Sequence, residues 1–435
     1  MTDNTRTIGL AGAISIGIGG MVGGGIFAVL GEAVSLAHGA TAIAFLFAGL
    51  VALLSAYSYT KLSVKFQNSG GTVVFIDNAF NHNCLSGSVN LMLWLSYLVT
   101  ISLYASAFSS YALTFFPDNN IPWLKNMLIS LSILLPSLIN IISASLVSKS
   151  ESLIVLVKLI LLTLIIISGI SYVEIDRISP ATWVSPVNIV AAGMIIFVAY
   201  EGFELIANAA SEIKKPEINL PRAFYSATLL VILLYVLISI VTVGNISEQE
   251  IANTSDYALA VAAKPALGQL GFTLVAIAAL LSTFSAINAT IYGNARLGYF
   301  LAKTGVIPEL LSKKSGGIPV DGVLVTSILS LAIANSINLT EIAIIGSAGF
   351  LLIFSIVNIS AYKLRGVINA SSSITLLASF ISIGALSTLL IHTWGTNRNA
   401  IFVFLAFIIF SILFEILYGV FIRKHFLNRL YKYRR

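Results

Sequence analysis

The first residues that could do chemistry form a glycine cluster near the start of the chain. Six glycines fall within eleven apolar residues, Gly17-Ile18-Gly19-Gly20-Met21-Val22-Gly23-Gly24-Gly25-Ile26-Phe27. Because glycine costs a helix interior about 1 kcal/mol relative to alanine, this stretch predicts a broken helix. The backbone N–H groups of Gly23, Gly24 and Gly25 would then start a new helix, where the helix dipole favours a carboxylate.

A second break is predicted at Ala199-Tyr200-Glu201-Gly202-Phe203-Glu204, where two carboxylates flank a glycine in an apolar segment. Each carboxylate costs about 2.5–3.5 kcal/mol at mid-bilayer, which indicates a cavity with water or polar partners. Carbonyl groups that lose their helical partners suit an ammonium group. They are expected at 18–21, with Gly20 and Met21, and at 197–200, with Phe197, Val198 and Tyr200. An α-amino acid fits both breaks; the alternative is that the glycines only let helices pack closely.

Lys158 is a single lysine inside an apolar segment, Leu156-Val157-Lys158-Leu159-Ile160. It stands about eight positions from the segment's start, roughly 12 Å along a helix. A desolvated amine there is a candidate to gain and lose a proton during a reaction cycle. The alternative is that its long side chain extends along the helix to the membrane surface.

Other polar residues are weaker candidates. Glu204 is predicted to accept a proton, to bind an amine or to cap the second half of the broken helix. Glu415 is expected at an oligomer or lipid boundary. Hydroxyls that would face the first break are those of Ser282, Thr283 and Ser285. A single cysteine and four scattered histidines give no metal-ligand spacing, so neither a metal nor a cofactor is expected.

The composition of the whole chain indicates where these residues lie. The chain of 435 residues is 57% hydrophobic and 10% charged, and its mean hydropathy is +0.96. Such a composition predicts an all-α polytopic protein embedded in the lipid bilayer. Apolar runs predict twelve transmembrane helices near 8–36, 40–66, 84–115, 125–147, 150–172, 187–210, 222–246, 268–298, 321–338, 341–362, 373–393 and 399–424.

An even number of crossings places both termini on one side. Most of the 24 basic residues fall on the termini and connectors of that side, and the opposite side holds only Lys125, Arg177, Lys264 and Arg398. Both termini are therefore predicted to be cytoplasmic in a cell (plasma) membrane protein. The net charge of +6 reflects this topology, and no nucleic-acid partner is expected.

The two predicted breaks fall in the first and the sixth segment. They are the corresponding first helices if the chain holds two five-helix repeats of opposite orientation, which is typical of transporters. The expected units are 1–172 for the first repeat, 187–362 for the inverted second repeat, and 373–435 for two additional helices with a basic cytoplasmic tail.

Several separate motifs resemble those of the amino acid–polyamine–organocation (APC) family. Three lie at helix ends or breaks: Gly23-Gly24-Gly25-Ile26-Phe27, Ser69-Gly70-Gly71 and Gly202-Phe203-Glu204. The most specific lie in predicted cytoplasmic connectors: Glu212-Ile213-Lys214-Lys215-Pro216 with Asn219-Leu220-Pro221-Arg222-Ala223, and Ala295-Arg296-Leu297 through Ala302-Lys303-Thr304-Gly305 to Pro308 and Pro319.

The resemblance implies a LeuT-type fold with 5+5 inverted repeats and broken helices 1 and 6. It also implies that a substrate carboxylate meets Gly24 and Gly25, and that its amine meets carbonyls near Met21, Val198 and Glu201. The family usually has serine where this chain has Gly24, which predicts a wider and less discriminating site. In this architecture a sodium ion often bridges helices 1 and 8. By analogy, the Lys158 ammonium would supply that charge and favour proton coupling.

The sequence as a whole predicts a secondary transporter that imports mainly neutral L-amino acids with a proton and without sodium. It is not expected to be an enzyme, because no nucleophile and base or metal-ligand set stands out in the segments. An exchanger or uniporter for amino acids or polyamines, and a membrane nutrient-sensing receptor, remain alternatives. The oligomeric state stays open. Predicted substrate-binding residues are Gly20, Met21, Gly23, Gly24, Gly25, Phe197, Val198, Tyr200, Glu201 and Gly202.

Overall fold

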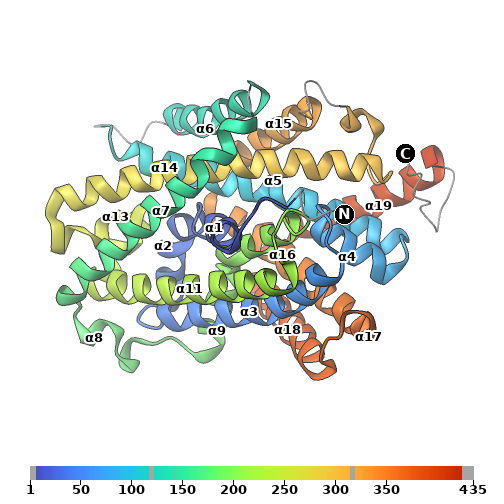
Figure 1. The fold of residues 1–435 in the computed structure, drawn as a ribbon. Coiled ribbons are helices and arrows are strands. Elements are labelled where there is room, and N and C mark those ends of the chain that lie inside the picture. Colours follow the sequence, from blue (N-terminus) through green and yellow to red (C-terminus); the bar gives the residue numbers. More distant parts are fainter. Residues whose placement is uncertain (1–5, 117–121, 143, 314–318, 424–435) are drawn as a thin grey trace.

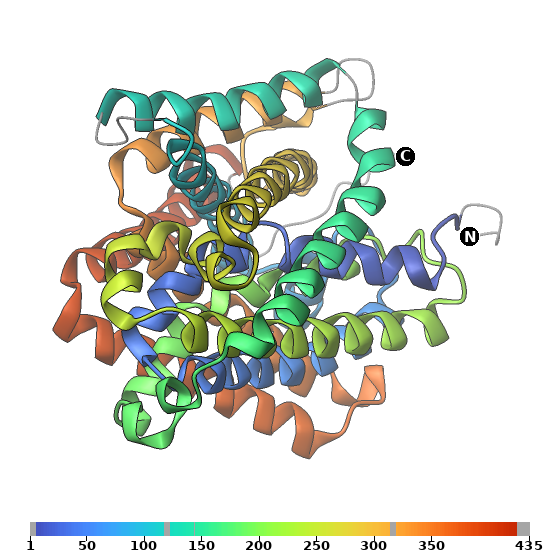
Figure 2. The same cartoon turned by 90° about the vertical axis from the view of Figure 1, so that its left-hand side faces the viewer.

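The helices pack together in one bundle and cross one another at different angles (Figure 1 and Figure 2). The computed structural model describes residues 6–116, 122–142, 144–313 and 319–423. The helices up to the second break are α1 (Leu10–Met21), α2 (Gly25–Ala37), α3 (Thr41–Lys65), α4 (Gly71–Phe80), α5 (Cys84–Leu113), α6 (Pro122–Ile142), α7 (Ala144–Gly169), η2 (Ile170–Tyr172), α8 (Ile175–Ile178), η3 (Pro180–Thr182), α9 (Pro186–Ile195) and η4 (Phe197–Glu204).

The remaining helices complete the bundle. They are α10 (Leu205–Asn208), α11 (Pro216–Asn245), α12 (Glu248–Thr254), η5 (Ser255–Tyr257), α13 (Ala258–Ala262), α14 (Lys264–Lys303), η6 (Glu309–Ser312), α15 (Val320–Ser336), α16 (Leu339–Lys363), α17 (Arg365–Ile368), α18 (Ser372–Thr396), α19 (Arg398–Tyr418) and η7 (Gly419–Arg423).

The helices match the membrane segments expected from the sequence. Within the described residues, 9 helices are long and apolar enough to cross a membrane, or up to 11 if each bent helix pair is one span. The remaining predicted segment, 321–338, corresponds to α15, which has 17 residues and a length of about 25 Å. The all-α polytopic class is therefore confirmed, and the number of twelve crossings stays a prediction.

The second and the sixth predicted segment both end beside the start of the described chain. Arg6 donates to Gln67 after α3 over 2.6 Å, and the Ile8 amide donates to the Glu212 carbonyl after α10 over 3.0 Å. Figure 1 places α8 and α13 at the opposite side, which Figure 2 turns toward the viewer. This alternation is what regular crossings predict. Which side faces the cytoplasm stays a prediction.

Both predicted helix breaks are present. The first separates α1 from α2, which are bent by 45°. The second bends α9 against the following segment by 46° and begins at Ile196, earlier than the predicted stretch from Ala199 to Glu204. Its position depends on α16: the Ser347 hydroxyl donates to the Ile195 carbonyl over 2.6 Å and accepts from the Val198 amide over 2.9 Å. A side chain distant in sequence thus satisfies the released backbone groups.

The two breaks pack against each other through their glycines. A Cβ atom on Gly202 would lie 2.1 Å from the carbonyl carbon of Gly20, and one on Gly25 would lie 2.7 Å from the Ala199 Cα atom. Both distances are far below van der Waals contact, so α1, α2 and η4 meet backbone to backbone. Close packing, the alternative considered for the glycine cluster, therefore accompanies the break and does not replace it.

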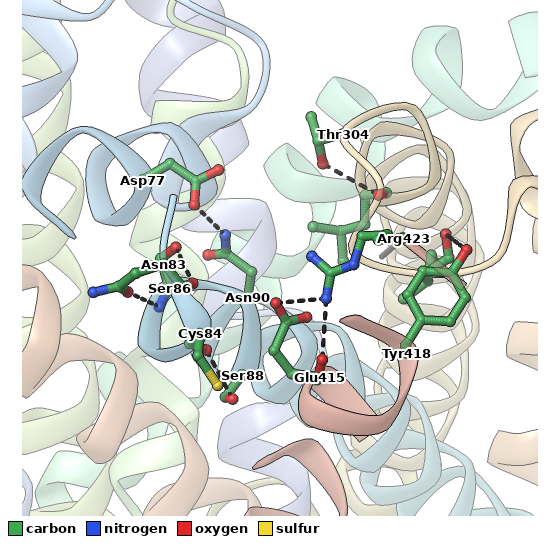
Figure 3. Close-up of polar contacts among 12 residues, drawn as sticks. Asp77, Asn83, Cys84, Ser86, Ser88, Asn90, Thr304, Glu415, Tyr418 and Arg423 are labelled. Atoms are coloured by element: carbon green, nitrogen blue, oxygen red, sulfur yellow. Dashed lines mark hydrogen bonds and ion pairs between the residues drawn. The ribbon is translucent and has the colours of Figure 1, made fainter. Parts of the chain in front are cut away.

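An ion pair joins the last two helical segments, α19 and η7. Arg423 Nη2 lies 2.8 Å from Glu415 Oε1 and donates to the Glu415 carbonyl over 3.1 Å (Figure 3). Glu415 is buried beside α5, where a Cβ atom on Gly87 would lie 2.2 Å from its Cδ atom. The expectation that Glu415 lies at an oligomer or lipid boundary is wrong, because Arg423 and Gly87 provide charge and space inside the protein. The basic tail from 424 onward lies outside the described residues.

Candidate functional site

A small cavity lies beside the two breaks, among α1, α5, α7, α10, α14 and η4. Its volume is about 20 Å³, which leaves room for little more than one water molecule. Four residues predicted from the sequence, drawn from four separate segments, meet there: Gly20, Lys158, Glu201 and Ser285. The other lining residues are Gly19, Tyr97, Tyr104, Leu205, Ala286, Ala289 and Thr290.

Lys158 enters the cavity because of the pattern on α7. Val155, Lys158, Leu162 and Ile165 are buried, and their spacing of three and four residues defines one helix face. Leu156, Val157 and Ile160 lie on exposed parts of the helix. Lys158 is only 4% exposed, so its side chain lies inside the protein. This position argues against a lysine that extends along the lipid-facing surface.

Glu204 lies outside the cavity in a cluster of hydroxyl groups. Its Oε2 atom accepts hydrogen bonds from Tyr59 and Thr72, both over 2.9 Å, and its Oε1 atom accepts one from Tyr97. Glu204 stands at the N-cap position of α10, as the capping interpretation expects, but its side chain makes no capping hydrogen bond there. Tyr97 also lines the cavity, and it therefore connects Glu204 with the site.

Glu201 is the carboxylate that faces the cavity. It is 3% exposed, and the Tyr104 hydroxyl interacts with its carboxyl group. Its Oε2 atom has no hydrogen-bond partner within the part of the chain that the structure describes. A buried carboxylate oxygen without a donor is costly, so this atom is available to a ligand that donates.

Three carbonyl groups at the first break, those of Met21, Val22 and Gly23, already accept hydrogen bonds from side chains. Tyr235 of α11 donates to the Met21 carbonyl over 2.6 Å and to the Ala199 carbonyl over 3.3 Å. Ser282 of α14 donates to the carbonyls of Val22, over 3.0 Å, and Gly23. Side chains of two neighbouring helices thus satisfy the break.

Several other predicted residues are packed rather than exposed to the cavity. A Cβ atom on Gly24 would lie 2.1 Å from the Tyr104 ring, so the wider site expected at Gly24 is not present: the ring occupies the space. Tyr200 donates to the Phe45 carbonyl over 2.9 Å, and Phe197 stacks edge-on against Phe354. Thr283 donates to the Ala279 carbonyl of its own helix over 2.7 Å.

Sequence reasoning missed the tyrosines of this site. Tyr97 and Tyr104 stand seven residues apart on α5, which places both on one helix face. That spacing within an apolar segment was a usable signal. Tyr235 and Ser347 gave only the weaker signal of a hydroxyl group in an apolar helix, where a buried hydroxyl needs a partner.

Replacing Ser282 by alanine is expected to lower the free energy of unfolding by about 1–2 kcal/mol, because two carbonyls at the break lose their donor. Thermal unfolding of the purified protein measures the loss. Thr283→Val is the matched control, since its hydroxyl bonds only within α14. Equal losses for the two variants would show that the contact of Ser282 with the break adds nothing.

Known proteins are similar to this chain over the helices described above. A family model described as amino acid permease matches residues 8–423. An uncharacterized protein of Methanocaldococcus jannaschii is 35% identical over 431 residues, which cover 98% of each chain. The inner membrane transport protein YbaT of Escherichia coli is 31% identical over 424 residues, 97% of this chain and 98% of the relative. A methylthioribose transporter of Bacillus subtilis is 26% identical and covers 97% and 94%.

These matches confirm the family resemblance carried by the glycine breaks and the connector motifs. They also agree with the architecture, because the matched region contains every helix of the bundle and both broken segments. The chain is therefore a member of the amino acid permease family of membrane transport proteins.

Proposed function

We propose that this protein is a secondary active transporter that imports mainly neutral L-amino acids together with a proton and without sodium. The observation that carries the proposal is the cavity that brings Lys158 and Glu201 together beside two broken helices. We also propose that both termini lie in the cytoplasm, that the protein spans the cell membrane, and that residues 1–172 and 187–362 form the inverted repeats.

Transport then requires the cavity to open. A space of about 20 Å³ is too small for an amino acid, so α1 and η4 must move relative to α5 and α14. The amide groups of Gly24 and Gly25 at the start of α2 would receive the substrate carboxylate once the Tyr104 ring swings away. Gly20 lines the cavity already. Once the cavity opens, its surrounding backbone and walls would also include Met21, Gly23, Phe197, Val198, Tyr200 and Gly202.

Lys158 is the proposed proton carrier. When protonated, its charge holds α1, α7 and α14 in one arrangement around the cavity, and loss of the proton lets the inner gate shift. Glu204 is a secondary candidate, reached through Tyr97. The Ser282 hydroxyl already donates to the carbonyls of Val22 and Gly23, which leaves less room for a metal ion there and supports sodium independence.

Uptake of radiolabelled alanine into sodium-free proteoliposomes tests the proposal. An inward gradient of about one pH unit is expected to drive up to about tenfold accumulation for one proton per substrate, since one unit equals 1.36 kcal/mol. Uptake that ignores the gradient but requires internal amino acid would show an exchanger, and uptake without either would show a uniporter. Binding without uptake would favour a receptor.

One relative is named for methylthioribose, so a second substrate class belongs in the same assay. Competition by unlabelled methylthioribose measures it directly. The zwitterionic pattern of the site, with a lysine and a glutamate on one cavity, favours amino acids. Complete competition by methylthioribose with none by amino acids would overturn that assignment.

A further inference from the structure

We propose that the carboxylate of Glu201 accepts the substrate's ammonium group and so makes the protein select ligands that carry one. The inference rests on the proposed function, because it names the part of the amino acid that this cavity recognises. The sequence pattern had pointed to backbone carbonyls for this task.

The first step is that several of those carbonyls already have partners. The Met21 and Ala199 carbonyls accept from Tyr235, and the Ile195 carbonyl accepts from Ser347. An ammonium group arriving at these oxygens would have to share them with a buried hydroxyl donor, which makes them weaker acceptors than a carboxylate oxygen without a donor. Of the first break, only Gly19 and Gly20 line the cavity with their backbone.

The second step is that Glu201 offers a strong acceptor at the right place. Its side chain is 97% buried and lines the cavity, and its Oε2 atom lacks a donor among the described residues. Glu204 does not compete for this role, because three hydroxyl groups already donate to it. An ammonium group supplies three donors and a positive charge, which makes a strong charge-assisted bond to a carboxylate.

The third step concerns the other groups that face the cavity. Lys158 is the opposite charge, and Tyr97, Tyr104, Ser285 and Thr290 add hydroxyl groups. A zwitterion matches this pair of charges, with its ammonium at Glu201. An α-hydroxy acid such as lactate has a neutral hydroxyl group in place of the ammonium, so it offers Glu201 one uncharged donor and adds an uncompensated negative charge to the site. Discrimination between these two ligands therefore reports on Glu201.

The test measures binding to the purified full-length protein by competition between radiolabelled alanine and unlabelled alanine or lactate. In the wild type, alanine is expected to bind at least about tenfold more tightly than lactate. A charge-assisted hydrogen bond to Glu201 accounts for a difference of this size. Glu201→Gln keeps the shape and removes the charge. It is expected to weaken alanine binding at least about tenfold and to bring the ratio of the two affinities close to one.

Glu341→Gln is the matched control, because Glu341 lies in the first turn of α16 and outside the cavity. It is expected to keep the wild-type ratio. Should Glu201→Gln fail to fold, Glu201→Asp replaces it, since this variant keeps the charge on a shorter side chain; a reduced preference for alanine is then expected.

Two outcomes separate the two proposals. Wild-type protein that binds alanine, together with a Glu201 variant that keeps the wild-type preference over lactate, overturns the role of Glu201 and leaves the proposed function standing. Wild-type protein that binds no amino acid overturns both. A Glu201 variant that changes only the proton dependence of uptake and keeps the ratio of affinities would show that Glu201 acts with Lys158 in proton coupling. That result likewise overturns the inference.

Discussion

Replacing Lys158 by alanine is expected to abolish the stimulation of amino acid uptake by a proton gradient. The gradient-dependent part of the initial uptake rate should fall at least about tenfold, the loss associated with a missing proton-transfer group. The reason is positional: Lys158 is the basic side chain among the cavity-lining residues, and it is buried within reach of both broken helices. Proteoliposomes with and without an inward gradient measure the effect.

Two further variants identify what the lysine contributes. Lys158→Arg keeps a positive charge but does not release its proton, so it should also lose the response to the gradient. Lys264→Ala is the control, because Lys264 lies at the start of α14 beside Phe272 and outside the cavity. A Lys158→Ala protein that still concentrates alanine under a gradient would remove Lys158 from the coupling mechanism.

Replacing Gly202 by alanine is expected to destabilise the protein by about 3 kcal/mol or more and to abolish uptake. The new Cβ atom would lie 2.1 Å from the Gly20 carbonyl carbon and 2.3 Å from the Met21 amide nitrogen. These are backbone atoms of α1 that cannot move aside as a flexible side chain does, so the cost is at the upper end of overpacking. Thermal unfolding and alanine uptake of the purified, reconstituted protein measure the two effects.

The matched control is the same substitution at Gly293 of α14, where the added Cβ atom meets nothing within 4 Å. This variant should be unchanged or more stable by up to about 1 kcal/mol, because alanine is the better helix former. Equal stability of the two variants would mean that the two breaks do not pack backbone to backbone.

Much of the fold was predictable because its causes are local. A membrane helix must satisfy its own backbone, so an apolar run of sufficient length predicts a span without knowledge of its neighbours. The glycine cluster predicted the first break at the right place, and α1 ends at Met21 within it. Lys158 and Glu201 also stood out, because a charge in an apolar segment is unusual whatever surrounds it.

The polar partners of the site were not predictable in the same way. Tyr235 bonds to Met21 from 214 residues away, and Ser282 bonds to Val22 from 260 residues away. A hydroxyl in an apolar helix shows that a partner is needed, but its identity depends on which helices become neighbours. The same holds for the Tyr104 ring, which closes the space left by Gly24.

The sequence by itself therefore determined the class of protein, most of its helices, the existence of two breaks and the residues whose charge demands an explanation. Only the tertiary structure decided where the second break begins, which carbonyls already have donors, and which of two nearby carboxylates is enclosed by hydroxyl groups and which faces the cavity. The physical reason is that helix formation and membrane insertion are properties of a segment, whereas the hydrogen bonds of a buried polar group are properties of the helices packed around it.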